Sequence, residues 1–477
     1  MKFLRALGLG LFTLAGWAYT TLFFLVLKAL MLPVGAAALG WQALGLDRVA
    51  RALPWLMVPV SQAGLFFVCS DAGRAWLVAL PLGQWWWPLL FVALLGLFFL
   101  SGTLLGAAPK TLPDIETSVA TRWPERRWAH RMRVPLDAIF VRLTFSCALV
   151  AAPAFLAALV PGWGNLWLLL VVHTVALATI ASTFELVDHT TMHNGLFSPT
   201  GLSGFDRGAM QLLSFAFDWV LTPICNRVPN WYRVQHLAVH HVENGSAEDS
   251  QSILAEDRTS HLAFCRAALS FGVDYVTGAG VIPYLRRHGR SAYLAQLLRG
   301  LAVYVVMLLA LALLNWRFAL FVWLARFFSG AMAAALNFTW HALADPRDLA
   351  NTYRNTVNSS LATAPYNLGQ GAHIEHHLNP GRHWSKLHAD AEATQATHRA
   401  QGALELDPVL GERFLALMWL RRFDALAQGM AIPGEAKDPA ALARLLEERS
   451  RPSSLPPRSA LLAGLDRALG HLGAALQ

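Results

Sequence analysis

Histidines gather in three short segments of the chain, and their spacing is that of a metal site. The segments DHTTMHN (188–194), HLAVHH (236–241) and HIEHH (373–377) supply His189, His193, His236, His240, His241, His373, His376 and His377. On a helix, side chains three or four residues apart share one face, so these imidazoles can converge. The second histidine of each doublet points about 100° away from the first, which suits a second, neighbouring ion.

A ninth histidine, His341, follows Asn337 by four residues in the segment NFTWH. One zinc ion takes about four ligands, so eight or nine imidazoles are too many for it. They suit two five- or six-coordinate ions, and imidazole is a good ligand for iron. We therefore expect a site for two iron ions. The alternative for His341 is a structural histidine at the end of a helix, with its ring hydrogen-bonded within the protein.

Acidic residues beside the boxes are candidates for orienting the rings, because a ligating histidine usually donates its other N–H to a carboxylate or carbonyl. The candidates are Asp188, Glu243 and Glu375. Five histidines outside the pattern are expected to be solvated or interfacial: His130, His261, His288, His398 and His471.

The composition indicates an integral membrane protein. Of 477 residues, 55% are hydrophobic and only 14% are charged, whereas soluble domains average roughly 25% charged residues. A span needs about 20 apolar residues, and the sequence offers six such stretches. We therefore predict an all-α membrane bundle of about six transmembrane helices, with a helical cap that carries the metals. The stretches are 6–31, 84–106, 138–160, 163–187, 299–316 and 318–340. Arg326, inside the last stretch, should face the bundle. Residues 52–69, interrupted by Pro54, Pro59 and Gln62, are predicted to be re-entrant or interfacial.

Basic residues predict the orientation. Residues 111–137 are rich in arginine, so the positive-inside rule makes this loop cytoplasmic, and all nine histidines then lie on the cytoplasmic face. We divide the chain into an N-terminal membrane extension (1–110, with 6–31 as a retained anchor), the basic loop (111–137), the membrane domain with the boxes (138–400) and an amphipathic cytoplasmic tail (401–477). The Ala/Leu/Arg-rich composition favours a bacterial inner membrane.

At these motifs the chain resembles the membrane fatty acid desaturase family, over about residues 138–390. Beyond the boxes, the likeness rests on Tyr366-Asn367-x-Gly369 before the third box and Pro380-x-x-His383-Trp384 after it. The resemblance implies a membrane bundle whose cytoplasmic cap holds two Fe²⁺ ions. Asn337 and His341 resemble the Asn-x-x-x-His pair of stearoyl-CoA desaturases, which implies that His341 is a ligand and that Asn337 holds a metal-bound water.

The leading interpretation is an oxygen-dependent desaturase of a fatty acyl or related lipid chain. The middle box departs from it, since most desaturases have two residues before the doublet and this chain has three. That spacing occurs in membrane alkane hydroxylases, so a hydroxylase or monooxygenase stays open. A third interpretation is a non-enzymatic membrane protein or transporter whose histidines sense pH or bind zinc, although transporter sites usually lie near the midplane.

Each turnover needs two electrons, and the sequence has no G-x-G-x-x-G after a strand, no C-x-x-C and no His-Pro-Gly-Gly of a fused cytochrome b5. We therefore expect a separate ferredoxin- or cytochrome b5-like carrier. Basic residues such as Arg347, Arg382 and Lys386 are candidates to bind it, or lipid headgroups. The positive charge gathers at the ends of the spans, which indicates topology and lipid contact rather than nucleic acid.

Overall fold

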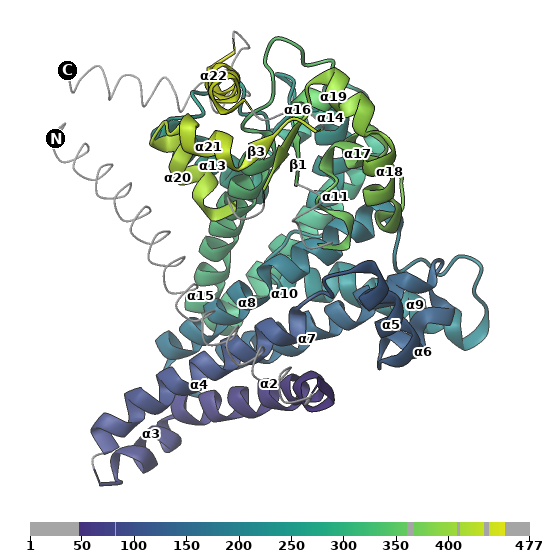
Figure 1. The fold of residues 1–477 in the computed structure, drawn as a ribbon. Coiled ribbons are helices and arrows are strands. Elements are labelled where there is room, and N and C mark those ends of the chain that lie inside the picture. The colour runs from purple at the N-terminus through teal and green to yellow at the C-terminus, as the bar shows by residue number, and fades with distance from the viewer. Residues whose placement is uncertain (1–46, 82, 360–366, 408–410, 434–437, 454–477) are drawn as a thin grey trace, which may run out of the picture.

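The computed structural model describes residues 47–81, 83–359, 367–407, 411–433 and 438–453, and helices dominate it (Figure 1). Five helices in these ranges are long and apolar enough to cross a membrane. They are α2 (Asp47–Cys69), α4 (Gly83–Gly106), α7 (Ala138–Leu159), α8 (Leu166–Asn194) and α15 (Ser291–His341), whose apolar stretch is Ser291–Arg326. The predicted helical membrane bundle is confirmed, while the span expected at 6–31 lies outside the described residues.

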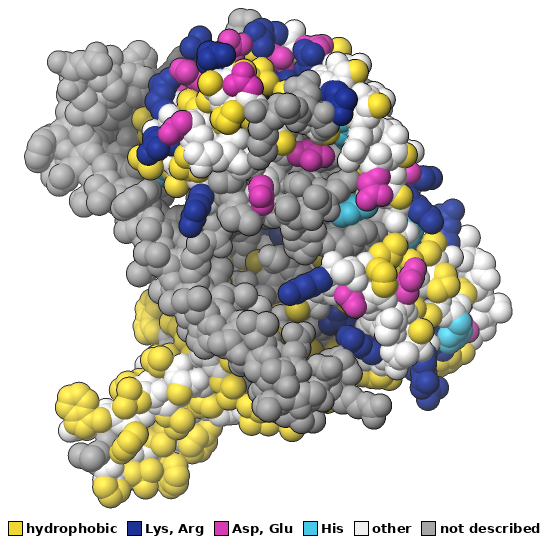
Figure 2. Space-filling model, in the orientation of Figure 1, with side chains coloured by type: hydrophobic (Ala, Val, Ile, Leu, Met, Phe, Trp, Pro, Cys, Tyr) yellow, Lys and Arg dark blue, Asp and Glu magenta, His cyan; other side chains and the backbone are white. Residues whose placement is uncertain are grey.

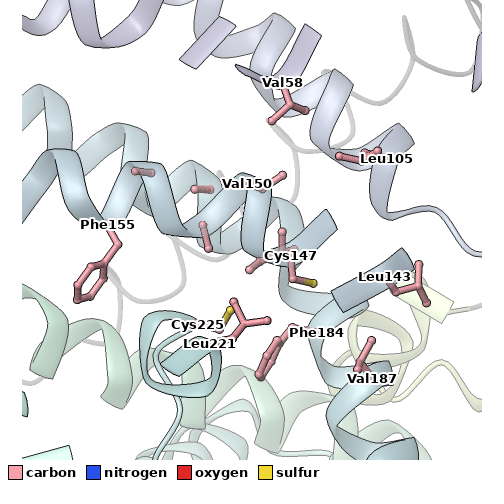
Figure 3. Packing of buried hydrophobic residues seen from close by; sticks show 14 of the residues in the cluster. Val58, Leu105, Leu143, Cys147, Val150, Phe155, Phe184, Val187, Leu221 and Cys225 are labelled. Carbon is pink, nitrogen blue, oxygen red and sulfur yellow. The ribbon is translucent and has the colours of Figure 1, made fainter. Parts of the chain in front are cut away.

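The core of the bundle is formed where α7 and α8 pack on each other and on α2 and α4. Val58 of α2, Leu105 of α4, Cys147 of α7 and Phe184 of α8 belong to one buried cluster (Figure 3). Helix α4 comes close to α8 at Gly102, where a Cβ atom would lie 2.6 Å from Cγ2 of Thr179. Hydrophobic side chains cover the surface of α2–α4, and charged side chains gather at the opposite end (Figure 2).

Helix α2 corrects one expectation. It is continuous through Pro54 and Pro59, and it is one of the five candidate spans, so the predicted interruption is wrong. The polar side chain that suggested a break is satisfied by a neighbour, because Gln62 Nε2 donates to the carbonyls of Leu149 (3.2 Å) and Val150 (2.9 Å) on α7. A hydrogen bond to the next helix removes much of the cost of burying an amide.

Helix α15 is two legs joined by a sharp bend at Asn315, whose φ and ψ (−155° and 89°) are not helical. The Arg326 guanidinium lies 6.0 Å from the ring centroid of Tyr304, although 22 residues of straight helix would separate them by roughly 33 Å. The legs therefore fold back on each other, as the two expected stretches 299–316 and 318–340 require. Arg326 is fully buried and donates to the carbonyls of Asn226 and Tyr275, which confirms that it faces the bundle.

The basic loop is structured and fixed to the bundle. It contains α5 (Leu112–Thr121), α6 (Glu125–Trp128) and the 3₁₀ turns η1 (Ala129–Arg131) and η2 (Pro135–Asp137). Arg142 at the start of α7 pairs with the buried Glu125 (Nε–Oε1 2.9 Å) and donates to the carbonyl of Leu105 on α4 (2.9 Å). The loop is thereby held against α4 and α7. Helix α3 (Asp71–Val78) joins α2 to α4 at the other end.

The elements after α8 build the cap and bring the remaining histidines to the C-terminal ends of α8 and α15. Those between α8 and α15 are α9 (Gly204–Phe215), η3 (Ala216–Leu221), α10 (Thr222–Ile224), α11 (Trp231–Gln235), η4 (His236–His240), α12 (His241–Glu243), α13 (His261–Thr277) and α14 (Val281–Arg287). Those after α15 are α16 (Thr352–Asn355), η5 (Asn367–Gly369), α17 (His373–Leu378), η6 (Trp384–Lys386), α18 (Leu387–Ala393), α19 (Gln395–Gln401), α20 (Gly411–Trp419), α21 (Phe423–Gln428) and α22 (Pro439–Ser450).

A small sheet accompanies these helices. Strand β1 (Val357–Ser359) pairs in parallel with β2 (Leu404–Leu406), which pairs antiparallel with β3 (Met430–Ala431). We did not predict these strands, because two or three residues are too short for an alternating pattern. Strand β1 precedes the third box and β2 follows it, so the sheet holds the two sides of this box together. The end of the tail that was expected to be amphipathic, residues 454–477, lies outside the described residues.

Candidate metal centre

The first box lies at the C-terminal end of α8. This helix begins at the Asn165 N-cap and ends at Gly195, which adopts the left-handed conformation (φ 59°) common after a helix. His189 and His193 are one turn apart before that end, and their ring centroids are 4.8 Å apart. The predicted shared helix face is therefore present.

The middle box forms a π-turn. His236–His240 is π-helical, and the backbone N–H of His241 donates to the carbonyl of His236, five residues back. In such a turn the side chain five residues along lies beside the first, as the one four along does in an α-helix. His241 Nε2 accordingly lies 3.1 Å from His236 Nε2. The wider turn accommodates the extra residue of this box. The doublet His240–His241 therefore points in the direction that it would have in an α-helix with two residues between the first histidine and the doublet.

The third box forms the short helix α17, and buried polar contacts fix it. Asn358 of β1 accepts from the N–H of Ile374 (2.8 Å) and donates to Glu375 Oε2 (3.1 Å). Glu375 also accepts from His398 Nε2 (2.5 Å), and His398 is only 1% exposed. The expectation that His398 is solvated is wrong, because its partner is a buried glutamate that the sequence spacing does not connect with it.

The structure brings all nine histidines together as two neighbouring groups. One consists of His189, His193, His236 and His376, and the other of His240, His341 and His377, with ligand atoms inside each group within 4.8 Å of one another. The remaining two stand beside them: His241 Nε2 is 3.0 Å from His376 Nε2, and the His373 ring centroid is 4.8 Å from that of His377. The doublet His376–His377 is split between the groups, as the helical angle predicts.

The distances in the four-histidine group fit a metal ion. His189 Nε2 and His236 Nε2 are 3.1 Å apart, and His241, which stands beside the group, has its Nε2 3.1 Å from His236 Nε2. Two imidazole nitrogens bound at right angles to one ion, each at roughly 2.1 Å, lie about 3.0 Å apart. In addition, His193 Nε2, His341 Nε2 and both ring nitrogens of His377 are buried without a hydrogen-bond partner. Buried polar atoms are rarely left unpaired, and a bound cation would satisfy them.

Three histidines are held by their outer nitrogens. His193 Nδ1 donates to the Pro380 carbonyl (2.9 Å), His240 Nδ1 to Asp249 Oδ2 (2.8 Å) and His341 Nδ1 to the Asn355 carbonyl (2.8 Å). Such bonds fix the tautomer that presents Nε2 to a metal.

The carboxylates selected from sequence do not have that role. Glu243 accepts from Tyr284 and Ser246, Glu375 accepts from His398, and no described hydrogen bond joins Asp188 to a box histidine. Proximity along the chain was a poor guide here, because the orienting groups come from loops and from segments far away in sequence. Asp249 was missed, and a lone aspartate nine residues beyond His240 gives no pattern that would have identified it.

Electrostatics prepare the imidazoles for binding. Burial, and then the neighbouring histidines, lower the pKa well below its ordinary value for His236, His241, His373, His376 and His377. Burial also lowers the pKa of His341 to about 3. The rings are therefore neutral at pH 7, which is the form that binds a metal.

Asn337 lies one turn before His341 on α15, and its side chain reaches a small cavity. Its Nδ2 is 3.5 Å from the carbonyl of Gln251, a marginal hydrogen bond. Apart from Asn337 and Gln251, the residues that line the cavity are apolar: Ile253, Phe264, Ala267, Ala268, Phe271 and Phe338. A role for Asn337 in holding a metal-bound water stays a prediction.

Comparison with known proteins gives one match. The family model described as fatty acid desaturase matches residues 166–405. This range covers half of the chain, from the start of α8 to β2, and it contains all three boxes with Asn337 and His341. No curated protein and no solved structure matches the chain.

Proposed function

Because the chain belongs to the fatty acid desaturase family, we propose that it is an oxygen-dependent desaturase that uses two iron ions to introduce a double bond into a fatty acyl or related lipid chain. The observation that carries the proposal is the convergence of nine histidines as two adjacent groups at one end of a membrane bundle. In a protein of this family, that arrangement supports oxidation of a lipid chain with O₂.

The metal ligands in this proposal are the nine histidines. His189, His193, His236, His241 and His376 would hold one iron, and His240, His341, His373 and His377 the other. Bound iron with oxygen supplies the oxidising power to remove hydrogen from an unactivated methylene, which side chains do not possess. The chain's own residues aim three of the imidazoles by outer hydrogen bonds and bury most of the nine rings, which keeps water away from the site.

We further propose a setting for this reaction. The substrate is a membrane lipid or acyl chain, the second substrate is O₂, and a separate ferredoxin- or cytochrome b5-like protein supplies the electrons. The protein would lie in a bacterial inner membrane, with the metal centre on the cytoplasmic face where the arginine-rich loop 111–137 also lies. Nucleic acid has no part in this proposal.

A hydroxylase or monooxygenase acting on an acyl chain, an alkane or another lipid is the second candidate. The observation that favours it is the three-residue spacing of the middle box. The π-turn weakens that argument, because it places His241 beside His236 despite the extra residue.

The test is gas chromatography–mass spectrometry of total lipids from cells that express the protein, beside cells that express His376→Ala. New unsaturated chains only with the unmutated protein would support the desaturase and locate the bond. New hydroxylated chains would support the second candidate instead. If neither product forms, iron analysis of the purified protein decides, since a protein that binds no iron contradicts both.

A further inference from the structure

The residues after the third box connect the candidate metal centre to the start of α7. His193 Nδ1 donates to the carbonyl of Pro380 (2.9 Å), so the position of this carbonyl helps to set the orientation of the His193 ring. A main-chain carbonyl stays in place only when its own segment of chain is held. The orientation of His193 therefore depends on the contacts that fix residues 379–384, which we call the 379–384 loop.

Asp137 holds this loop from the far side. Its Oδ1 accepts from Trp384 Nε1 (2.7 Å) and from His383 Nε2 (3.0 Å). The N–H of Ser385 donates to His383 Nδ1 (3.3 Å), which leaves the ring proton on Nε2, where the bond to Asp137 needs it. Asp137 is also the N-cap residue of α7, but in the described structure its side chain does not cap that helix. Its carboxylate, which is 2% exposed as part of Asp137, binds the loop instead.

Packing around Trp384 completes the attachment. Trp384 is 1% exposed, and its ring meets that of Phe140 on α7 edge to face, with centroids 5.6 Å apart. Gly369, before the third box, has a φ of 79°, and a Cβ atom there would lie 2.3 Å from the Trp384 carbonyl oxygen. Asn194, next to His193, accepts from the N–H of Trp384 (3.4 Å). The two motifs that flank the third box therefore meet at one buried tryptophan.

We propose that Asp137 is a positioning residue of the metal centre: through Trp384 and His383 it fixes the loop whose Pro380 carbonyl orients His193. The inference rests on the proposed function, because the orientation of His193 matters here for binding iron. It extends the site beyond the family match, which begins at residue 166 and does not include Asp137. It also gives a role to the end of the arginine-rich loop 111–137.

A purely structural role for Asp137 predicts a different result. His193 belongs to the four-histidine group, whereas His240 and His341 of the other group donate to acceptors outside the 379–384 loop. Helix α17, which carries the third box, is fixed separately by hydrogen bonds to Asn358. Loss of a positioning residue should therefore weaken one iron site. Loss of a merely structural contact should lower the stability of the fold and affect both sites alike.

The test is titration of the full-length, metal-free protein in detergent with Fe²⁺ under anaerobic conditions. Asp137→Ala is expected to weaken one of the two sites by about tenfold and to leave the other unchanged. Asp137→Asn keeps an oxygen that can accept both hydrogen bonds, so its affinities should stay within about threefold of wild type. Combining Asp137→Ala with Asp249→Asn should weaken both sites, because Asp249 holds His240 of the other group.

A second variant and a second measurement guard against a misfolded protein. Trp384→Phe removes the Nε1–H that Asp137 accepts and keeps a ring against Phe140, and it should weaken the same site as Asp137→Ala. Hydrogen exchange of the metal-free protein, followed by mass spectrometry, reports on the loop without iron. The amides of the 379–384 loop should exchange faster in both variants than in wild type, since the bonds that hold the loop are lost.

The matched control is Asp206→Ala. This aspartate on α9 pairs with Arg131 (2.7 Å) in the same arginine-rich loop, and its loss should leave both iron sites unchanged. Equal weakening of both sites by Asp137→Ala would overturn the proposal, and so would wild-type affinity in Asp137→Ala or Trp384→Phe, or the same weakening in Asp206→Ala. One site of wild-type affinity in the double variant would overturn it too. Failure of the proposed function is distinct, because it would show as unmutated protein that binds no iron.

Discussion

The two groups of histidines each bring imidazoles together, but the residues that position the rings differ between them. In the four-histidine group, helical spacing sets the geometry: His189 and His193 share a face of α8, and His236 Nε2 approaches His189 Nε2 to 3.1 Å. In the three-histidine group, His240 and His341 come from separate segments, and each is aimed by a hydrogen bond from Nδ1 to a buried acceptor. In the first group one ring of four, that of His193, has such an outer hydrogen bond, whereas in the second group two rings of three do, so the second group depends more on residues outside the boxes.

The largest effect should come from the four-histidine group itself. His376→Ala removes an imidazole that belongs to this group and also contacts His241. We expect loss of bound iron and activity below about 1% of wild type, because an iron site of this kind is built from its ligands. Iron analysis and lipid product analysis measure this. His288→Ala, which removes an exposed histidine paired with Glu248, is the control and should retain both iron ions.

The dependence of the second group on outer partners can be broken at Asp249. Asp249→Asn removes the carboxylate that accepts from His240 Nδ1, so the ring is no longer held in the tautomer that presents Nε2. Loss of such a partner costs about 10–100-fold in metal affinity. Titration of metal-free protein with Fe²⁺ should show one weakened site and one unchanged site. Equal weakening of both sites would contradict the division into two groups.

Acid should destabilise the metal-free protein. The pKa of His341 is lowered to about 3, and that of His377 is well below its ordinary value, both mainly by burial. In the unfolded chain these rings take up protons near pH 6.5. Because the unfolded state then binds more protons than the folded state, stability falls as pH drops below about 6.5 and is unaffected by these groups above it. Thermal melts between pH 8 and pH 5 measure this, and a flat profile would contradict it, because it would show that these rings take up protons over the same pH range in the folded and unfolded states.

The smallest effect is expected from a deletion. Removing Leu237 from the π-turn leaves H-x-x-H-H, which an α-helix presents on the same face, so iron binding should stay within about twofold of wild type. Removing both Thr190 and Thr191 from α8 is the comparison in a regular helix, because His193 then follows His189 by two positions, about 200° around the helix and on the opposite face. That variant should lose iron. Similar losses in both variants would mean that the π-turn has a purpose beyond spacing.

The bundle and the boxes could be predicted because they follow from local periodicity. Long apolar stretches gave α4, α7, α8 and the two legs of α15, and helical angles gave the split of His376 from His377. The partners of the boxes could not be predicted in this way. His240 pairs with Asp249, His193 with the Pro380 carbonyl and Glu375 with His398. Each of these contacts crosses a loop or joins segments that are distant in the sequence. Continuity of α2 was also missed, since the carbonyls that satisfy Gln62 belong to another helix.

The π-turn of the middle box has a consequence for evolution. The geometry predicts that the loss of one residue between His236 and His240 narrows one turn and leaves the ligands in place. The length of this segment is therefore free to drift in descendants of one ancestor while the metal centre stays constant. A classification by the number of residues in the middle box would then separate proteins that carry out the same chemistry. A classification by the turn that the box forms would place them together.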